Sequence, residues 1–395
     1  MDCGDGACLY QKCCRVVCSF LRLIDMENNN FSYQFYHTTT EAWDAMYQAI
    51  LTSQKSIYWE VYSLIDDAAG ERFIEALCAK ASSGVEVKII IDAVGSFGLS
   101  GAAESRLRLA GAEVMKYNRL NLGWSVPAWI NRLWKRNHRK VLLIDDEIAF
   151  LGGVNIEAPA SEWYDLHLKI TGKVVRPLLR AFAKSYVRSG GDKREVRQFL
   201  HPKLTGGLTE WRQKINFIIH SPTTTLAGGS LLRRVYHGAL ELARESFTLI
   251  TPYYVPDKKF LQLIARAKRR GVKVNIILPY RTDHRLMHYL SRTFFDLTER
   301  AGAALYFLRK MNHGKAFSVD NQAGLVGSSN LTPRSFFINE EAGAYFNDER
   351  MVSDLNKILV DWKEEAVPLA EVGGCERGWH SRFVDWLAKR FKDYV

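Results

Sequence analysis

Two short segments of the chain carry the same four polar residue types at the same spacing. In each segment a lysine follows a histidine by two residues, an aspartate follows the lysine by five, and an asparagine follows the aspartate by ten. A chance repeat of four such positions is very improbable, so both copies are expected to serve one chemistry. The residues are His138, Lys140, Asp145 and Asn155 in the first segment, and His313, Lys315, Asp320 and Asn330 in the second.

Two histidines, two lysines and two asparagines that meet in one site would suit the transfer of a phosphodiester. Lysine and asparagine can hold the non-bridging oxygens and balance the charge that develops in the transition state. One neutral imidazole can attack phosphorus, and the other, protonated, can donate to the leaving alcohol. Because the lysines supply positive charge, we expect neither a metal nor any other cofactor.

Each copy is predicted to form a β-hairpin. In the first, residues 138–144 form a strand, Asp145 and Asp146 turn the chain, and residues 148–151 return. Side chains at positions i and i+2 of a strand share a face, so each histidine should point the same way as its lysine. Asp145 and Asp320 lie at the turns, and we interpret them as structural residues that bond backbone groups rather than substrate.

Each histidine should also have an acidic partner that fixes its tautomer. Asp165 follows Asn155 by ten residues, and Glu341 follows Asn330 by eleven. Glu340 competes with Glu341 for this role.

The elements that would position these motifs are also duplicated. Residues 56–92 and 246–279 each predict a strand, a helix, a Gly-Val turn and a buried strand, and a helix-like stretch precedes each. Alternating strands and helices favour an α/β fold of two tandem halves with largely parallel central sheets, packed as a pseudo-dimer. The predicted divisions are a cysteine-rich leader (1–31), the first half (32–187), a polar linker (188–212), the second half (213–368) and a C-terminal helix (369–395).

The two motifs resemble the His-x-Lys-x4-Asp-x6-Gly-Ser-x-Asn signature of the phospholipase D superfamily. Ser328 keeps the signature serine in the second copy, and Gly153 replaces it in the first. ITPYYVPD, IDAVGSFGL and NLTPRSFFINEE look like stretches of bacterial cardiolipin synthases. Because no membrane-spanning helix is expected ahead of the first motif, the chain looks like the short form without transmembrane helices. The resemblance implies that two phosphatidylglycerols are joined and glycerol is released. It also implies that His138 is the nucleophile, His313 the general acid, and Glu341 rather than Glu340 the acidic partner.

The net charge of +11 predicts an anionic partner, which fits a membrane or nucleic acid. No stretch reaches the roughly 18 apolar residues that span a bilayer, so peripheral contact is expected, on the cytoplasmic face of the cell membrane. The last 17 residues predict a basic amphipathic helix of the kind that lies in a lipid interface. Its proposed membrane-binding side chains are Trp379, Phe383, Trp386 and Phe391.

Several alternatives stay open. A phospholipase D hydrolase would use water in place of an alcohol, and another transphosphatidylase would use a different alcohol. A nuclease of the same superfamily would share the chemistry, although we expect phospholipid substrates and no nucleic acid. A non-catalytic membrane-binding protein is disfavoured because both motifs are intact. The acceptor, the oligomeric state, the role of the leader cysteines and whether Met26 is the true start are not fixed by the sequence.

Overall fold

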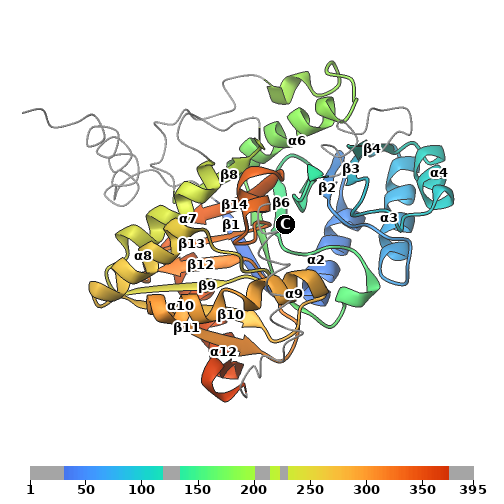
Figure 1. The fold of residues 1–395 in the computed structure, drawn as a ribbon. Helices are drawn as coiled ribbons and strands as arrows, with labels where there is room; N and C mark the ends of the chain where they lie inside the picture. The colour runs from blue at the N-terminus through green and yellow to red at the C-terminus, as the bar shows by residue number, and fades with distance from the viewer. Residues whose placement is uncertain (1–30, 119–133, 201–213, 223–229, 373–395) are drawn as a thin grey trace, which may run out of the picture.

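The computed structural model describes residues 31–118, 134–200, 214–222 and 230–372 (Figure 1). The predicted leader up to residue 30 lies outside the described residues. So does the chain from residue 373, which includes Trp379, Phe383, Trp386 and Phe391. None of the helices in the described part of the chain combines the length and the apolar character that crossing a bilayer requires.

The first half forms one seven-stranded sheet in the order β1-β7-β6-β5-β2-β3-β4. Helices connect β1 to β2, β2 to β3 and β3 to β4, and another helix follows β7. The strands are β1 (Ser32–Thr38), β2 (Ser56–Val61), β3 (Glu86–Asp92), β4 (Glu113–Tyr117), β5 (Val141–Ile144), β6 (Ile148–Gly152) and β7 (Tyr164–Thr171). The helices are α2 (Thr39–Thr52), α3 (Gly70–Ser82), α4 (Gly101–Leu109) and α6 (Arg176–Arg188).

The second half repeats this topology and adds one short edge strand, β15 (Val367–Pro368). Its order, read from the matching edge, is β8-β14-β13-β12-β9-β10-β11-β15. The other strands are β8 (Ile215–His220), β9 (Ser246–Ile250), β10 (Lys273–Pro279), β11 (Ala304–Leu308), β12 (Ala316–Val319), β13 (Ala323–Gly327) and β14 (Glu341–Phe346). The helices are α7 (Leu231–Leu242), α8 (Lys258–Arg269), α9 (Arg285–Arg292), α10 (Phe295–Ala301), α11 (Pro333–Phe337) and α12 (Glu349–Glu365).

The prediction of two tandem α/β halves is confirmed, but both sheets are mixed rather than largely parallel. Only β2-β3-β4 and β9-β10-β11 pair in parallel among the described strands, and the remaining neighbours are antiparallel. The reason lies in the connections. Helical crossovers return the chain in the same direction, whereas the tight turn of each motif forces its two strands to run antiparallel.

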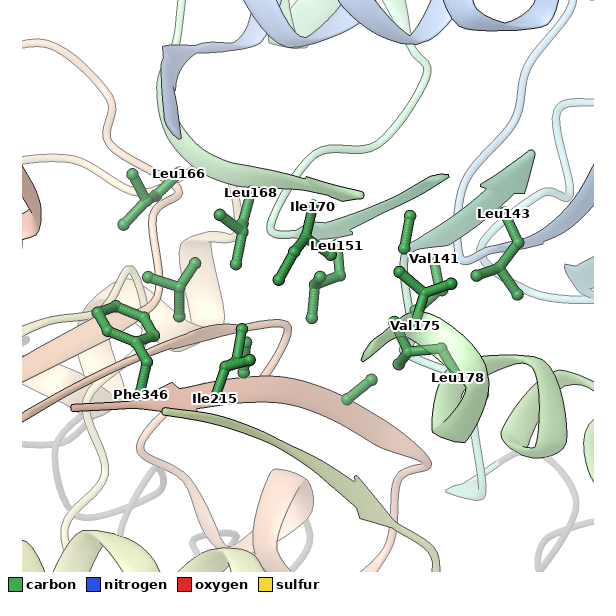
Figure 2. Packing of buried hydrophobic residues seen from close by; sticks show 14 of the residues in the cluster. Val141, Leu143, Leu151, Leu166, Leu168, Ile170, Val175, Leu178, Ile215 and Phe346 are labelled. Atoms are coloured by element: carbon green, nitrogen blue, oxygen red, sulfur yellow. The ribbon is translucent and has the colours of Figure 1, made fainter. Parts of the chain in front are cut away.

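The two sheets face each other across a shared hydrophobic core. Leu151 and Leu168 of the first sheet approach Ile215 and Phe346 of the second in Figure 2, and all four side chains are buried. Helices α6 and α12 complete this core, and Trp362 of α12 belongs to it. One continuous core therefore fixes the two halves against each other.

Each half also has an outer core between its sheet and its own helices. Phe73 and Leu77 of α3 are fully buried there, as are Phe260 and Ile264 of α8. Within each helix the two side chains are four residues apart, a spacing that places them on one face. In Figure 1 the first half runs from blue to green and the second from yellow to red, side by side.

The predicted linker is partly packed against the first half. Val196 and Phe199 are buried in the shared core, and Glu195 pairs with Lys88 at 2.6 Å. Residues 201–212 of the predicted linker lie outside the described residues.

Candidate active site

Both motifs form hairpins, although their strands begin later than expected. β5 starts at Val141 rather than at residue 138, and β12 starts at Ala316. His138 and Lys140 therefore precede the strand rather than lie within it. At the predicted turn, Asp145 and Asp146 have φ of 53° and 63°, and the backbone N–H of Glu147 donates to the carbonyl of Ile144. Two consecutive left-handed residues suit the twist of a tight hairpin, and aspartate tolerates this conformation.

The motif aspartates fasten each hairpin to the start of the neighbouring strand. The Asp145 carboxylate accepts hydrogen bonds from the backbone N–H groups of Gln54, Lys55 and Ser56 at 2.7 to 2.9 Å. These bonds outweigh the effect of burial and lower the pKa of Asp145. Asp320 makes the same contacts to the N–H groups of residues 244–246 at 2.8 to 2.9 Å. Both aspartates thus make the backbone contacts that the sequence predicts for them.

Each motif histidine is held by the backbone of the opposite half. The N–H of His138 donates to the carbonyl of Glu340 at 2.9 Å, and the N–H of His313 donates to that of Tyr164 at 2.7 Å. The preceding residues form parallel bridges, Asn137 with Glu340 and Asn312 with Tyr164. The segment carrying each histidine is therefore hydrogen-bonded to the residue that directly precedes the other half's acid.

The acidic partners are exchanged between the halves in the same way. Nδ1 of His138 lies 3.0 Å from Oε2 of Glu341, and Nδ1 of His313 lies 2.9 Å from Oδ2 of Asp165. The structure brings together all of the predicted histidines and acids. It pairs each histidine with the acid of the other half, a crossing that the sequence alone does not reveal.

Glu340, the competing acid, faces away from the histidines. Its carboxylate contacts Arg139 at 2.8 Å, Ser221 at 2.8 Å and Arg188. Arg139 is buried, and it also donates to Ser185 at 2.8 Å and to the carbonyl of His220 at 2.9 Å. This cluster joins the two halves behind His138 and leaves Glu341 as its acid. Sequence analysis missed Arg139, whose place in the second motif is taken by Gly314.

The two motif lysines are buried and point their ammonium groups into the same region. Lys140 Nζ donates to the carbonyl of His138 at 3.0 Å, and Lys315 Nζ donates to that of His313. Burial, followed by the charge of Lys315, lowers the pKa of Lys140 to about 7. Burial lowers the pKa of Lys315 to about 8. An ammonium has three donors, so each lysine keeps N–H groups for an anion placed between them.

The electrostatics favour a neutral imidazole at His138. Burial lowers its pKa to about 4, and the nearby charges of Lys140 and Lys315 act in the same direction as burial. Glu341 opposes these effects without overcoming them. The pKa of Glu341 is itself lowered, because His138 and Lys140 outweigh the effect of burial. An anionic acid that accepts the Nδ1 proton leaves Nε2 of a neutral ring as a free base.

The motif asparagines retain unused hydrogen-bonding capacity. The side-chain oxygens of Asn155 and Asn330 are buried and have no partner among the described residues. The backbone of Asn155 is fixed by a hydrogen bond from the Trp43 indole at 2.8 Å, and the backbone N–H of Asn330 donates to Ser335 at 3.2 Å. Both residues are therefore held at the site by their backbones. The free oxygens can only accept hydrogen bonds, so the Nδ2 groups are the atoms that could donate to a phosphate, and Nδ2 of Asn155 also donates to Glu157 at 3.3 Å.

The missing serine of the first motif has a steric explanation. A Cβ atom at Gly153 would lie 2.0 Å from Oδ1 of Asp165 and 2.9 Å from the carbonyl oxygen of His313. In the second half, Ser328 instead donates to Oε2 of Glu341, the atom that contacts His138. Asp165 therefore fills the space at Gly153 that a serine side chain would need, whereas Ser328 has room beside Glu341.

Three aromatic rings that sequence analysis did not identify surround the histidines. The ring of Tyr62 lies 5.0 Å from that of His138 and 4.8 Å from Lys140 Nζ. The rings of Trp163 and Tyr253 lie 5.7 and 6.4 Å from that of His313. Tyr62 and Tyr253 follow β2 and β9, and the carboxyl end of a parallel strand is where ligand-binding residues of such sheets are expected. That position is the signal that could have found them.

Comparison with known proteins identifies relatives over most of the chain. A family model described as "Cardiolipin synthase, PLD-like domain" matches residues 46–186 and 236–362. The cardiolipin synthase of Geobacillus thermodenitrificans is 29% identical over 362 residues, which cover 88% of this chain and 69% of that protein. Minor cardiolipin synthase ClsB of Bacillus subtilis is 27% identical over 370 residues, covering 92% and 89%.

Solved structures share the architecture at lower identity. The phosphatidylserine synthase of Haemophilus influenzae superposes with a TM-score of 0.73 at 16% identity, covering 97% of this chain and all of that one. The polyphosphate kinase of Porphyromonas gingivalis superposes with a TM-score of 0.56 at 13% identity, covering 91% of this chain and 56% of that one. At these identities the structural similarity establishes the fold and does not identify the substrate.

Proposed function

Because this chain belongs to the phospholipase D-like cardiolipin synthase family, we propose that it transfers a phosphatidyl group from one phosphatidylglycerol to another. Its chemistry is that of a phospholipid phosphatidyltransferase. Glycerol would leave in the first step, and cardiolipin would form in the second. The donor, the acceptor and the histidine intermediate are the parts that we propose.

In the first step, Nε2 of His138 attacks the phosphorus of the donor and the bond to the headgroup glycerol breaks. Glu341 accepts the Nδ1 proton of His138 and orients the ring. His313 gives a proton to the departing glycerol oxygen, and the Asp165 carboxylate 2.9 Å away balances the charge of its imidazolium. The ammonium groups of Lys140 and Lys315 and the Nδ2 groups of Asn155 and Asn330 donate to the non-bridging oxygens.

In the second step, a hydroxyl of the acceptor headgroup attacks the phosphohistidine. His313, now neutral, removes the hydroxyl proton while the phosphorus–nitrogen bond to His138 breaks. The enzyme returns to its starting protonation state, and the net reaction exchanges one glycerol for one phosphatidylglycerol.

The crossed pairing of histidines and acids is the observation that best supports this proposal. It supplies two imidazoles, each with an acid on Nδ1, around two buried lysines, and the charge of Lys315 lowers the pKa of Lys140. A single half would have a histidine without its acid. A non-catalytic protein would have no need to bury two lysines and two histidines together.

Lipid mass spectrometry of the purified protein tests the proposal directly. Incubation with phosphatidylglycerol vesicles should yield cardiolipin and free glycerol, and the His138→Ala variant should yield neither. Parallel reactions should include phosphatidylethanolamine or a DNA duplex. Phosphatidic acid as the sole product would indicate a hydrolase, and DNA cleavage without lipid turnover would indicate a nuclease. Full transfer by His138→Ala would refute the proposed nucleophile.

We also propose that the protein contacts the cytoplasmic face of the cell membrane peripherally. The net charge of +11 favours an anionic bilayer, and α9 presents Leu286 and Tyr289 with 42% and 41% exposure. This helix lies close to the site, since Asp283, two residues before it, accepts a hydrogen bond from Tyr253 at 2.8 Å. The segment with Trp379 and Trp386 would add a second anchor.

Vesicle flotation tests this association. The protein should float with vesicles that contain phosphatidylglycerol and much less with vesicles of phosphatidylcholine alone. Replacing Trp379 and Trp386 with glutamate should weaken flotation while leaving turnover of detergent-dispersed lipid intact. Equal binding to both vesicle types would contradict an anionic surface as the partner.

A further inference from the structure

The two histidine environments are equivalent in backbone but not in charge. Next to His138, the carbonyl of Arg136 accepts a hydrogen bond from Glu340 N–H at 2.9 Å. Next to His313, the carbonyl of Met311 accepts the matching bond from Tyr164 N–H, also at 2.9 Å. Arg136 and Met311 therefore occupy corresponding positions, two residues before each histidine.

A second pair of corresponding positions differs in the same direction. The bridges Leu64–Ile156 and Tyr254–Leu331 relate the segments that follow the motif asparagines. Three residues beyond these bridges the first half has Pro159 and the second has Arg334. His138 pairs with Glu341 of the second half, and Arg334 lies between Asn330 and Glu341 in that half, so Arg334 lies on the His138 side of the site. This side of the site thus carries two arginines that the His313 side lacks.

Arg136 is buried with most of its hydrogen-bonding capacity unused. Its side chain is 1% exposed, and its one ion pair joins Nη1 to Asp92 Oδ1 at 3.3 Å. Its Nε and Nη2 atoms are buried and have no partner among the described residues. Burying guanidinium N–H groups without acceptors costs free energy, which a bound anion would offset.

Arg334 lies close enough to share that anion. Burial lowers its pKa, and the charge of Arg136 contributes in the same direction, while Tyr62, Asp92 and Glu341 act against it. Its Nη2 donates to the carbonyl of Trp134 at 3.4 Å, and its guanidinium stacks 5.7 Å from that indole ring. The charges of both arginines also lower the pKa of Tyr62 against the larger effect of burial, and the ring of Tyr62 contacts that of His138. Two cations that repel each other beside the nucleophile are the arrangement expected of a subsite that binds an anion.

We propose that Arg136 and Arg334 bind the phosphate of the acceptor phospholipid, next to the phosphohistidine that the acceptor attacks. This rests on the proposed function and adds to it, because the donor phosphate is already provided for by the two lysines and two asparagines. The acceptor is thereby expected to be an anionic lipid rather than water or a neutral alcohol. Bidentate guanidinium groups suit a phosphodiester.

The test compares acceptors at a fixed donor. The Arg334→Gln variant is incubated with phosphatidylglycerol vesicles, alone or with a large excess of ethanol as a neutral acceptor. Loss of one charge-assisted contact should lower cardiolipin formation roughly tenfold to a hundredfold, mainly through the KM for phosphatidylglycerol as acceptor. Phosphatidylethanol formation should stay within about twofold of wild type, since it needs only the donor phosphate.

Matched variants make the outcome decisive. Arg334→Lys should recover part of the cardiolipin yield, and Arg269→Gln, which removes an exposed cation at the end of α8, should change nothing. An unchanged ratio of cardiolipin to phosphatidylethanol in Arg334→Gln would overturn the proposal. So would an equal loss of both products, because the arginines would then act on the donor. A wild-type protein that forms no phosphatidyl product at all would instead refute the proposed function.

Discussion

Replacing Glu341 with glutamine should slow formation of the phosphohistidine, because this acid of the second half orients the nucleophile of the first. The hydrogen bond to His138 is 3.0 Å long, and Glu341 is 0% exposed, so solvent screens it little. A hydrogen bond to a charged group contributes about 1.5–3 kcal/mol. If all of that is lost in the transition state, the rate falls by about tenfold to 150-fold.

Substrates with different leaving groups distinguish the role of the His138–Glu341 pair from that of the His313–Asp165 pair. Glu341→Gln and Asp165→Asn are each assayed with phosphatidylglycerol and with a phosphatidyl ester of p-nitrophenol, whose leaving group needs no proton. The readout is the first-turnover burst of released glycerol or p-nitrophenol, which reports the first step alone. Glu341→Gln should be impaired to the same degree on both substrates, since attack by His138 precedes either departure. Asp165→Asn should be impaired on phosphatidylglycerol and largely recovered on the nitrophenyl ester, since it supports the general acid His313. The opposite pattern would mean that the roles of the histidines are exchanged, and no loss in either variant would refute the reasoning.

Four further outcomes follow from the geometry. Glu340→Gln should lower the free energy of unfolding by about 3 kcal/mol in chemical denaturation, because it weakens a buried charge cluster, while the phosphohistidine rate of the folded enzyme holds. Calorimetry with dimethyl phosphate, an anion whose charge is constant near neutrality, should show affinity falling by up to about tenfold per pH unit above pH 7. The reason is that Lys140, with a pKa of about 7, loses its proton there, and a bound anion favours the protonated form. Lys140→Gln should move the onset of this fall to about pH 8, the pKa of Lys315. Gly153→Ala should displace Asp165 and reduce phosphatidyl transfer, whereas Gly101→Ala, with open space around its Cβ, should be silent in the same assay. Asp145→Ala should lower the thermal midpoint through a loss of about 1–3 kcal/mol, with kcat/KM preserved at temperatures where the variant is folded.

The repeated motifs predict the components of the site well because they are local in sequence. The hairpin turn at Asp145 and the contact of its carboxylate with backbone N–H groups follow from turn chemistry alone. The mixed character of the sheets could not be predicted from the sequence. Buried strands have similar apolar runs whether they pair in parallel or belong to an antiparallel hairpin. The extent of each motif strand was overestimated because His138 bridges to the other half rather than extending β5.

What the sequence could not provide is the set of contacts between the halves. His138 and Glu341 are 203 residues apart, and His313 and Asp165 are 148 apart. Spacing within one motif carries no information on which half supplies the acid. Tyr62 and Tyr253 were missed for a related reason, since each lies next to the histidine of its own half only after β2 has paired with β5 or β9 with β12. The unused hydrogen-bonding atoms of the buried Arg136 side chain likewise become visible only in the coordinates.

A fused duplication permits an asymmetry that a symmetric dimer of one half could not have. In such a dimer both histidines would face the same acid, the same neighbour two residues before them and the same residue at the signature serine. Here the His138 side combines Glu341 with Ser328 and Arg136, and the His313 side combines Asp165 with Gly153 and Met311. A nucleophile and a general acid require different surroundings, because one must be neutral and the other protonated when the same bond breaks. Burial and the charges of Lys140 and Lys315 keep the His138 ring neutral. The additional arginines on this side can attract an anionic acceptor, so this departure from symmetry serves the second step of the proposed transfer.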